Sequence, residues 1–422
     1  MEHLESPRSV GDGDQSVAVP PPPLWIFALL VLPNAIFSNG FVSTVMSSLL
    51  RSEHMSLGDI ANVTALISLP PALYFLWSPL VDFLIRRRTW IVVSGAVTGA
   101  LLCAALEAPM LGAPGPRFLL LLAMCVSLLM SAAVGGLMAA LVPPDQKARA
   151  GAFYQVGNVG LAALAGGGML YFSDHMTRRW FGVVSGLMVA VPALLSLMVA
   201  EPEVAGKHDS YRTVLKQIGA EFRHTFFQWK AVPVLLIMCA PFGSGAAISL
   251  LPGLAPEYGI SVDQVAWMNG LGGGLLTALG ALLVGFMKMP PDLRPVYAWI
   301  GLVNASTLGI LLLGHPRPVT YFAGVTLYLI TVGACYALFT ALVLQLLGIS
   351  GKSGGARYSI ALSLGNLPIF YMTVVDGMGA RWFGTKGEPG IDLAVSGGTA
   401  VLALVWFAWE RRRIFAVQRV LS

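Results

Sequence analysis

Charged residues are scarce in this chain of 422 residues: Asp, Glu, Lys and Arg make up 11% of it, against about 25% in a soluble domain. Hydrophobic residues make up 56%, more than a soluble protein of this size could bury, which excludes a soluble enzyme, a disordered chain and a nucleic-acid-binding protein. The composition predicts a polytopic helical membrane protein, and the net charge of +5 is then typical of basic loops held on one side of a bilayer.

Twelve apolar runs follow one another along the chain, each close to the ~20 residues that a helix needs to span a bilayer. They lie near residues 24–50, 57–85, 90–109, 118–142, 150–172, 180–200, 231–255, 262–287, 295–314, 319–347, 357–376 and 391–409. The runs are too long, and too evenly apolar, for the alternating strands of a membrane barrel. We therefore expect an all-α protein with twelve transmembrane helices.

The Lys and Arg residues predict the orientation of these helices. With the N-terminus in the cytoplasm, 19 of the 26 basic residues fall in cytoplasmic segments. The positive-inside rule thus favours twelve spans with both termini in the cytoplasm, and we expect a multi-pass protein of the inner membrane.

The polar segment 201–230 divides the spans six and six. We expect a disordered N-terminal tail (1–23), a first half (24–200), a cytoplasmic linker (201–230), a second half (231–409) and a basic cytoplasmic tail (410–422). Apolar residues from Tyr211 to Phe222 recur at helical spacing, which predicts a short helix on the membrane surface; an ordinary solvated linker helix is the alternative.

Three sequence matches indicate that the two halves are duplicates. The pattern Asp-x-Met-x-x-Arg-Trp-Phe-Gly occurs at 174–182 and again at 376–384, after the fifth and eleventh spans. Gly-Asn recurs at 157–158 and 365–366, and the helix-capping segments Ser56 to Asp59 and Ser261 to Gln264 also correspond. Parallel six-helix halves are the layout of the major facilitator fold, with a cavity between them near the midplane. We expect the Asp-to-Gly pattern to fix a hairpin turn in both halves, with a gate role as the alternative.

A carboxylate and an arginine cluster lie between the second and third spans. Asp82 is followed by Arg86, Arg87 and Arg88, and a buried acid at a helix end requires a partner. We assign these residues, with Arg149, to a gate that closes the cytoplasmic side; a topogenic arginine run beside a snorkelling Asp is the alternative. The corresponding segment of the second half, 288–294, looks degenerate.

Two segments resemble a known family. The sequence Phe75-Leu-Trp-Ser-Pro-Leu-Val-Asp82, followed by Arg86-Arg-Arg-Thr-Trp90, is similar to the signature of the muropeptide permease and acetyl-CoA transporter family (AmpG-type permeases) and of related siderophore importers. Residues 149–160 resemble the fifth helix of that family. The resemblance implies a major facilitator transporter that moves a muropeptide, a peptide or a siderophore.

The spans that usually line such a cavity contain no charged residue, so we expect neutral polar groups to line it. The candidate substrate-binding residues are Asn34, Ser38, Ser131, Tyr154, Gln155, Asn158, Asn269, Tyr328, Thr331, Tyr336 and Asn366. An unpaired amide in hydrocarbon costs several kcal/mol, roughly, so each should face protein or water. For any one of them, a helix–helix hydrogen bond accounts for the polar group as well as ligand contact does.

Glu107 is the one acid that we place well within a run, and we assign it as the candidate for proton coupling. No metal-ligand spacing or nucleotide motif occurs, so we expect no metal and no cofactor. The sequence favours a monomeric secondary transporter, or facilitator, that moves a partly apolar solute by alternating access. Protons are a further candidate partner, and we expect no nucleic-acid partner. A membrane-integral transferase and a non-transporting sensor on a transporter scaffold are the alternatives to a transporter.

Overall fold

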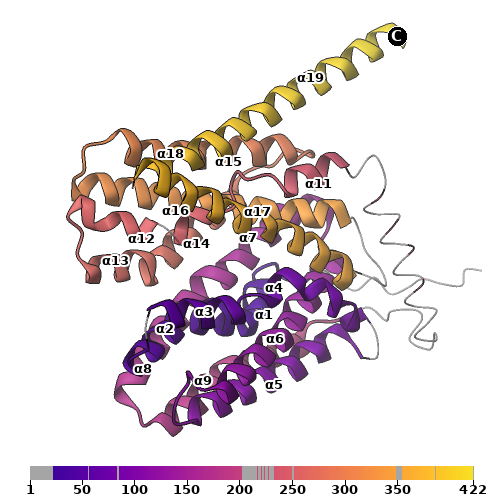
Figure 1. Cartoon of the computed structure of the whole chain (residues 1–422). Coiled ribbons are helices and arrows are strands. Elements are labelled where there is room, and N and C mark those ends of the chain that lie inside the picture. Colours follow the sequence, from indigo (N-terminus) through magenta and orange to yellow (C-terminus); the bar gives the residue numbers. More distant parts are fainter. Residues whose placement is uncertain are drawn as a thin grey trace, which may run out of the picture.

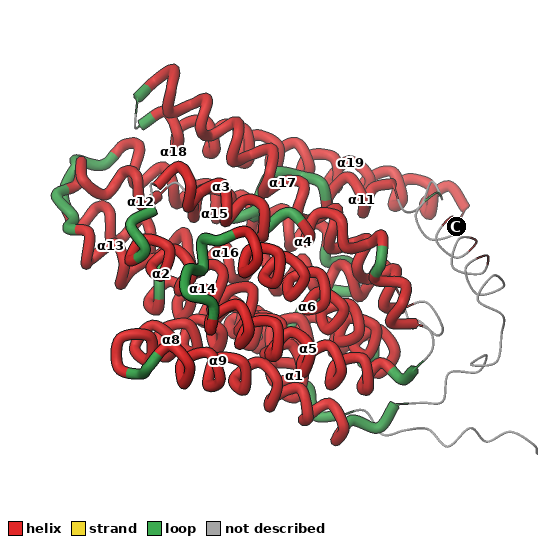
Figure 2. The backbone as a smooth tube through the Cα atoms, turned by 60° about the horizontal axis from the view of Figure 1, so that its bottom comes forward, coloured by secondary structure: helices red, strands yellow, loops and turns green. Residues whose placement is uncertain are grey.

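The computed structural model describes residues 22–55, 57–82, 85–201, 232–249, 251–347, 354–384 and 386–421, with four isolated positions in the linker. Within these residues every regular segment is helical, as Figure 2 shows. Nine of the described helices are long and apolar enough to cross a membrane. The prediction of an all-α, multi-pass membrane protein is confirmed.

The first half contains the segments up to the linker. They are α1 (Ile26–Ala35), η1 (Ile36–Val45), α2 (Met46–Ser52), α3 (Leu57–Ile67), α4 (Pro70–Leu73), η2 (Tyr74–Leu76), η3 (Ser78–Asp82), α5 (Arg87–Glu107), α6 (Pro114–Leu141), η4 (Pro144–Gln146), α7 (Lys147–Gln155), η5 (Val156–Leu161), α8 (Ala162–His175), α9 (Arg178–Ala193) and η6 (Leu194–Met198).

The second half follows the linker. Its segments are α11 (Val232–Met238), η7 (Ala246–Ser249), α12 (Leu251–Leu254), η8 (Ala255–Tyr258), α13 (Val262–Asn269), α14 (Leu271–Phe286), α15 (Arg294–Leu313), α16 (Pro318–Leu347), α17 (Gly354–Phe383), α18 (Gly387–Asp392), η9 (Leu393–Gly397) and α19 (Gly398–Leu421). The basic tail at 410–421 continues α19 as helix.

Three predicted spans, the second, seventh and eighth, are broken into shorter helices. Pro70 and Pro71 start a new helical segment within the second span, because proline cannot donate the backbone hydrogen bond that a continuous helix needs. The seventh span opens into a turn after α11, where Gly243 and Gly245 have φ angles of 71° and 76°. Non-helical backbone at membrane depth is tolerated where protein or a cavity surrounds it.

The two halves lie against each other, the first below the second in Figure 1. The fifth span of the first half (α7, η5 and α8) packs on α14 and α16, and α17 packs on α6, α4 and η3. Glycines allow the closest approaches between the halves: a Cβ on Gly151 would lie 2.7 Å from the carbonyl oxygen of Ala337. Small residues at such crossings are typical of helices packed in a membrane.

The structure corrects one of the sequence repeats. In the first half, the Asp-to-Gly pattern spans the turn between α8 and α9, and Asp174 is exposed in the last turn of α8. In the second half, α17 continues to Phe383, so Asp376 lies two turns inside a helix and is fully buried. The expectation that both copies fix a hairpin turn is therefore wrong for the second.

The predicted interfacial helix and the predicted disordered tail fall outside the described residues, apart from the isolated linker positions. The capping segment at Ser261 is confirmed. The backbone N–H of Gln264 donates to the Ser261 hydroxyl over 3.4 Å, and the backbone N–H of Ser261 donates to Gln264 Oε1 over 3.0 Å.

Candidate substrate cavity

A cavity of about 700 Å³ lies between the halves and is lined by both of them. Eight of the predicted substrate-binding residues line it, and they are Asn34, Ser38, Ser131, Tyr154, Gln155, Asn158, Tyr336 and Asn366. No Asp, Glu, Lys, Arg or His occurs among the described residues of its wall. The cavity is polar through amides, hydroxyls and backbone carbonyl groups, and its volume is typical of pockets that bind drug-sized molecules.

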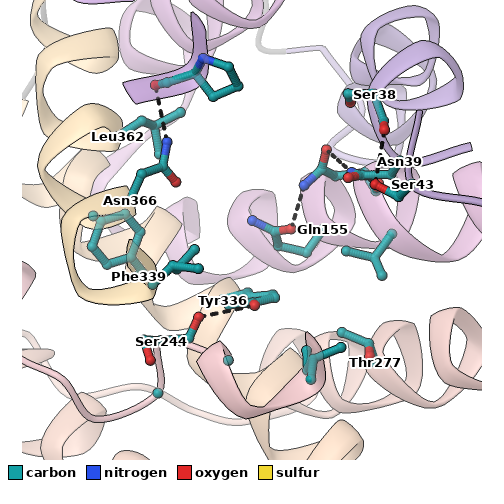
Figure 3. Close-up of a pocket in the computed structure, with 18 of the residues that line it drawn as sticks. Ser38, Asn39, Ser43, Gln155, Ser244, Thr277, Tyr336, Phe339, Leu362 and Asn366 are labelled. Carbon is teal, nitrogen blue, oxygen red and sulfur yellow. Dashed lines mark hydrogen bonds between the residues drawn. The ribbon is translucent and has the colours of Figure 1, made fainter. Parts of the chain in front are cut away.

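Two π-helical segments shape the wall in the first half. Both η1 and η5 lie within long spans, where a π-helical bulge is a frequent mark of a functional site. Asn39 on η1 donates from Nδ2 to the carbonyl oxygen of Asn158 on η5, over 2.8 Å. Asn39 on η1 and Asn158 on η5 both line the cavity. Gln155, the last residue of α7, lies beside them, and Figure 3 shows Asn39 and Gln155 facing the same space.

A chain of hydrogen bonds runs from this wall into the second half. Asn158 Nδ2 donates to Gln155 Oε1 over 3.1 Å, and Gln155 Nε2 donates to Thr340 Oγ1 on α16 over 2.9 Å. Asn366 on α17 joins the halves elsewhere, since its Nδ2 donates to the carbonyl oxygen of Pro71 over 3.3 Å. These amides therefore both line the cavity and hold the halves together.

The break in the seventh span forms the opposite wall. The positive φ angles of Gly243 and Gly245 suit glycine, which has no side chain to clash, and they leave carbonyl groups without helical partners. Tyrosine hydroxyls satisfy two of these carbonyls: Tyr336 donates to Ser244 over 3.2 Å, and Tyr297 donates to Phe242 over 3.3 Å. Figure 3 shows Tyr336 reaching Ser244 beside the cavity.

Two buried polar atoms stand out in the wall of the cavity. Asn34 Oδ1 makes no hydrogen bond among the described residues, and the Tyr74 hydroxyl lies beside Ser131. Both residues line the cavity. A buried polar atom without a partner is unfavourable, so Asn34 Oδ1 marks a part of the wall that the described residues do not satisfy.

Two predicted residues lie elsewhere. Tyr328 is buried in a separate apolar cluster beside Tyr258 and Tyr321. Thr331 accepts a hydrogen bond from Asn304 Nδ2 over 2.9 Å and so joins α15 to α16. Asn269 ends α13, and its side chain lies outside the described parts of the chain.

Sequence reasoning missed other residues that line the cavity. Helical spacing alone did not single out the wall residues Tyr74, Ser244, Thr277, Tyr297 and Phe339. The signals that could have found Tyr74 and Ser244 are the neighbouring Pro70-Pro71 and Gly243-x-Gly245 breaks, because irregular backbone at membrane depth lines cavities.

The Asp82 and arginine cluster lies on the face from which the linker leaves. Arg87 pairs with Asp82, with 2.8 Å between NH2 and Oδ1, and both side chains are almost fully buried. Glu201, at the end of the sixth span, accepts hydrogen bonds from the backbone N–H groups of Arg87 and Arg88, over 3.1 and 3.2 Å. A carboxylate at a helix N-terminus is favourable, so Glu201 anchors the start of α5.

The second half repeats this arrangement, which corrects the expectation that its segment 288–294 is degenerate. Arg294, at the start of α15, pairs with Asp292, with 2.9 Å between NH2 and Oδ2. Glu410 of α19 lies 3.7 Å from the same guanidinium group. Each half thus joins an aspartate before its third span to an arginine at the start of that span and to a glutamate at the end of its sixth.

Other residues connect the halves on the linker face. Lys147 Nζ donates to the carbonyl oxygen of Leu344 over 2.7 Å, and the hydroxyl groups of Ser78 and Ser359 contact each other. Arg149, two residues after Lys147 on α7, is exposed. Glu107 lies exposed at the last residue of α5, where the Cys103 thiol is 4.0 Å from Oε1.

Two helical halves around a central polar cavity are the layout of major facilitator transporters. The chain belongs to the Major Facilitator Superfamily, whose family model matches residues 27–373. Among solved structures, it is similar to the human organic anion transporter MFSD10 (TETRAN), at 14% identity and a TM-score of 0.65, with 91% of this chain and 99% of that chain covered. It is also similar to the proton:xylose symporter XylE bound to 6-bromo-6-deoxy-D-glucose, at 15% identity and a TM-score of 0.64, with 92% of this chain and 94% of that chain covered.

Proposed function

We propose that this transporter moves a small to medium, partly apolar solute by alternating access, through the cavity between its halves. The observation that carries the proposal is the wall of the cavity, which offers amides, hydroxyls and aromatic rings but no charged side chain among the described residues. Such a wall suits a molecule that hydrogen-bonds and stacks, such as a muropeptide, a peptide or a siderophore. The siderophore and muropeptide classes follow from the sequence resemblance alone.

The described conformation is closed on the linker face. Lys147, Ser78 and Asn366 all contribute contacts that cross between the halves on that face or at the cavity itself. The lining continues away from the linker through Ser43 and Thr44 of η1. If the linker and both termini are in the cytoplasm of the inner membrane, as the basic residues predict, the conformation faces outward.

A matched pair of tyrosine variants tests the cavity. Tyr74 and Tyr358 are both buried tyrosines, but of the two only Tyr74 is among the described residues that line the cavity. Purified protein is first screened by thermal shift against muropeptides, peptides and siderophores, since a ligand stabilises the protein that binds it. For the compound that binds, we expect Tyr74→Phe to weaken the affinity by up to about tenfold, the equivalent of one hydrogen bond.

Tyr358→Phe should leave that affinity unchanged, and neither variant should lose thermal stability. Equal affinities in wild type and Tyr74→Phe, with Asn158→Ala also unaffected, would exclude this cavity as the binding site. Uptake of the labelled compound into proteoliposomes then separates transport from binding alone.

A further inference from the structure

Three carboxylic acids gather where α17 crosses α18, outside the cavity wall. Asp376 lies on α17, Glu388 and Asp392 lie on α18, and none is more than 5% exposed. The two helices approach backbone to backbone, because a Cβ on Gly387 would collide with the carbonyl group of Gly379. Asp376, one turn before Gly379, interacts electrostatically with both acids of α18.

The carboxyl groups of this cluster lack partners. Both oxygens of Asp376, and Oε1 of Glu388, are buried and have no hydrogen-bond partner among the described residues. Asp392 Oδ1 accepts one hydrogen bond, from the Ser396 hydroxyl over 2.6 Å. Asp376 therefore points its unsatisfied carboxyl group into a site formed mainly by another helix.

No cation among the described residues neutralises the cluster. Lys386, the basic residue nearest in sequence to α18, donates to the carbonyl oxygen of Leu312 over 3.3 Å, and Arg381 is exposed. Three other described segments pack on α18, and they are η7, η9 and α15. Neither η7 nor η9 contains a titratable residue, and α15 contains none after Tyr297. From α16, the buried Tyr328 hydroxyl interacts electrostatically with Asp376 and Asp392.

Burial without a counter-charge determines whether these acids are protonated. An isolated ionised carboxylate taken out of water is so unfavourable that the group binds a proton instead, and neighbouring like charges strengthen this effect. The described residues contain no group that could hold a metal ion, and none of the three acids is among the described residues that line the cavity. A proton fits a buried site that lies outside the described wall of the cavity and lacks metal geometry among the described residues.

We propose that Asp376, Glu388 and Asp392 form a proton-binding site that is closed to water in this conformation and is linked to the cavity through the broken seventh span. The linking element is η7, which packs on both α17 and α18, while its residues Ala246 and Ile248 line the cavity. Movement of η7 with the solute would open the cluster, so that a carboxylic acid there releases its proton to water. This inference rests on the proposed transport function.

Infrared difference spectroscopy of the full-length protein in lipid vesicles tests the site with protons alone. A protonated carboxyl group has its own C=O stretching band, and we expect the wild-type protein to lose this band as the pH is raised. Asp376→Asn should remove part of the band and leave the protein folded, because the amide has the same shape and no charge. The matched control is Asp174→Asn, the exposed copy of the sequence repeat, which should leave the band unchanged.

The variants distinguish this cluster from a carboxyl group elsewhere in the chain. A wild-type spectrum without a titrating band overturns the proposal, as does a band unaffected by Asp376→Asn, Glu388→Gln and Asp392→Asn. A band lost in Glu107→Gln instead assigns the proton to the end of α5 and also overturns it. If Asp376→Asn fails to fold, Glu388→Gln provides the same test. Because the spectrum reports the carboxyl groups without any solute, a negative result leaves transport untouched, and an absence of transport leaves the titration valid.

Discussion

The two halves build the same arrangement of aspartate, arginine and glutamate at the linker face but bury it to different depths. In the first half, the Arg87 and Asp82 side chains are 3% and 0% exposed. In the second half, those of Arg294 and Asp292 are 21% and 46% exposed. Both halves share the Arg–Asp ion pair, while the glutamate contacts backbone N–H groups in the first half and the guanidinium group in the second. Because the two ion pairs are buried to different depths, they should differ in energy.

The strongest test of this comparison removes each arginine in turn. Arg87→Ala removes the buried ion pair between Arg87 and Asp82, and we expect a loss of about 3–5 kcal/mol in the free energy of unfolding. Arg294→Ala breaks a partly exposed pair, which is worth about 1 kcal/mol or less. Denaturation of the two purified variants in the same detergent measures the difference.

A double variant, Asp82→Asn with Arg87→Met, provides the control, since it removes both charges together. It should recover much of the stability that Arg87→Ala loses. Equal losses in Arg87→Ala and Arg294→Ala would show that burial does not distinguish the two halves.

Hydropathy and repeats predicted an all-α, multi-pass membrane protein of the major facilitator fold, because membrane insertion and helix length constrain such a protein strongly. They predicted the helix boundaries less well where a span is broken or where a helix extends beyond its apolar run. The eleventh run ends at Asp376 in the sequence, yet α17 continues to Phe383, so an acid that looked like part of a turn is buried. Contacts between α17 and α18 determine this burial, and these contacts cannot be predicted from the hydropathy of one segment.

The residues of the cavity were also predicted in part. Eight of the residues chosen from helical faces line it, because faces rich in amides and hydroxyls avoid lipid. Tyr328 and Thr331 belong to an equally polar face, but they pack between α15 and α16 instead of lining the cavity. Periodicity identifies a polar face without indicating whether a helix or a cavity covers it.

An intermediate effect is expected where the halves meet each other. Lys147→Ala removes the hydrogen bond to the Leu344 carbonyl oxygen, a bond from a charged donor worth about 1.5–3 kcal/mol. Because this bond exists only while the linker face is closed, its loss should shift the equilibrium about tenfold or more toward opening on that face. Alkylation of a cysteine placed at Ala341, which is buried on α16 where that helix packs on α7, measures the opening.

Arg149→Ala is the matched control, because Arg149 lies on the same helix but is exposed. Unaltered alkylation is expected there. An increase in the Arg149 variant equal to that in the Lys147 variant would indicate that positive charge in general, rather than the bond to Leu344, holds the face closed.

The smallest effect concerns pH and the exposed pair of the second half. Burial raises the pKa of Asp292, but the hydrogen bonds and the charge of Arg294 outweigh it and hold that pKa below its ordinary value. A depressed pKa contributes stability that is present above the ordinary aspartate pKa of about 3.9 and is lost as the pH falls through the folded-state value. Asp292→Asn should therefore lower stability slightly, by under about 1 kcal/mol, in neutral buffer and leave it unchanged in strong acid. Thermal denaturation across an acid titration measures this difference, and a deficit that persists at the acid end would indicate packing rather than charge.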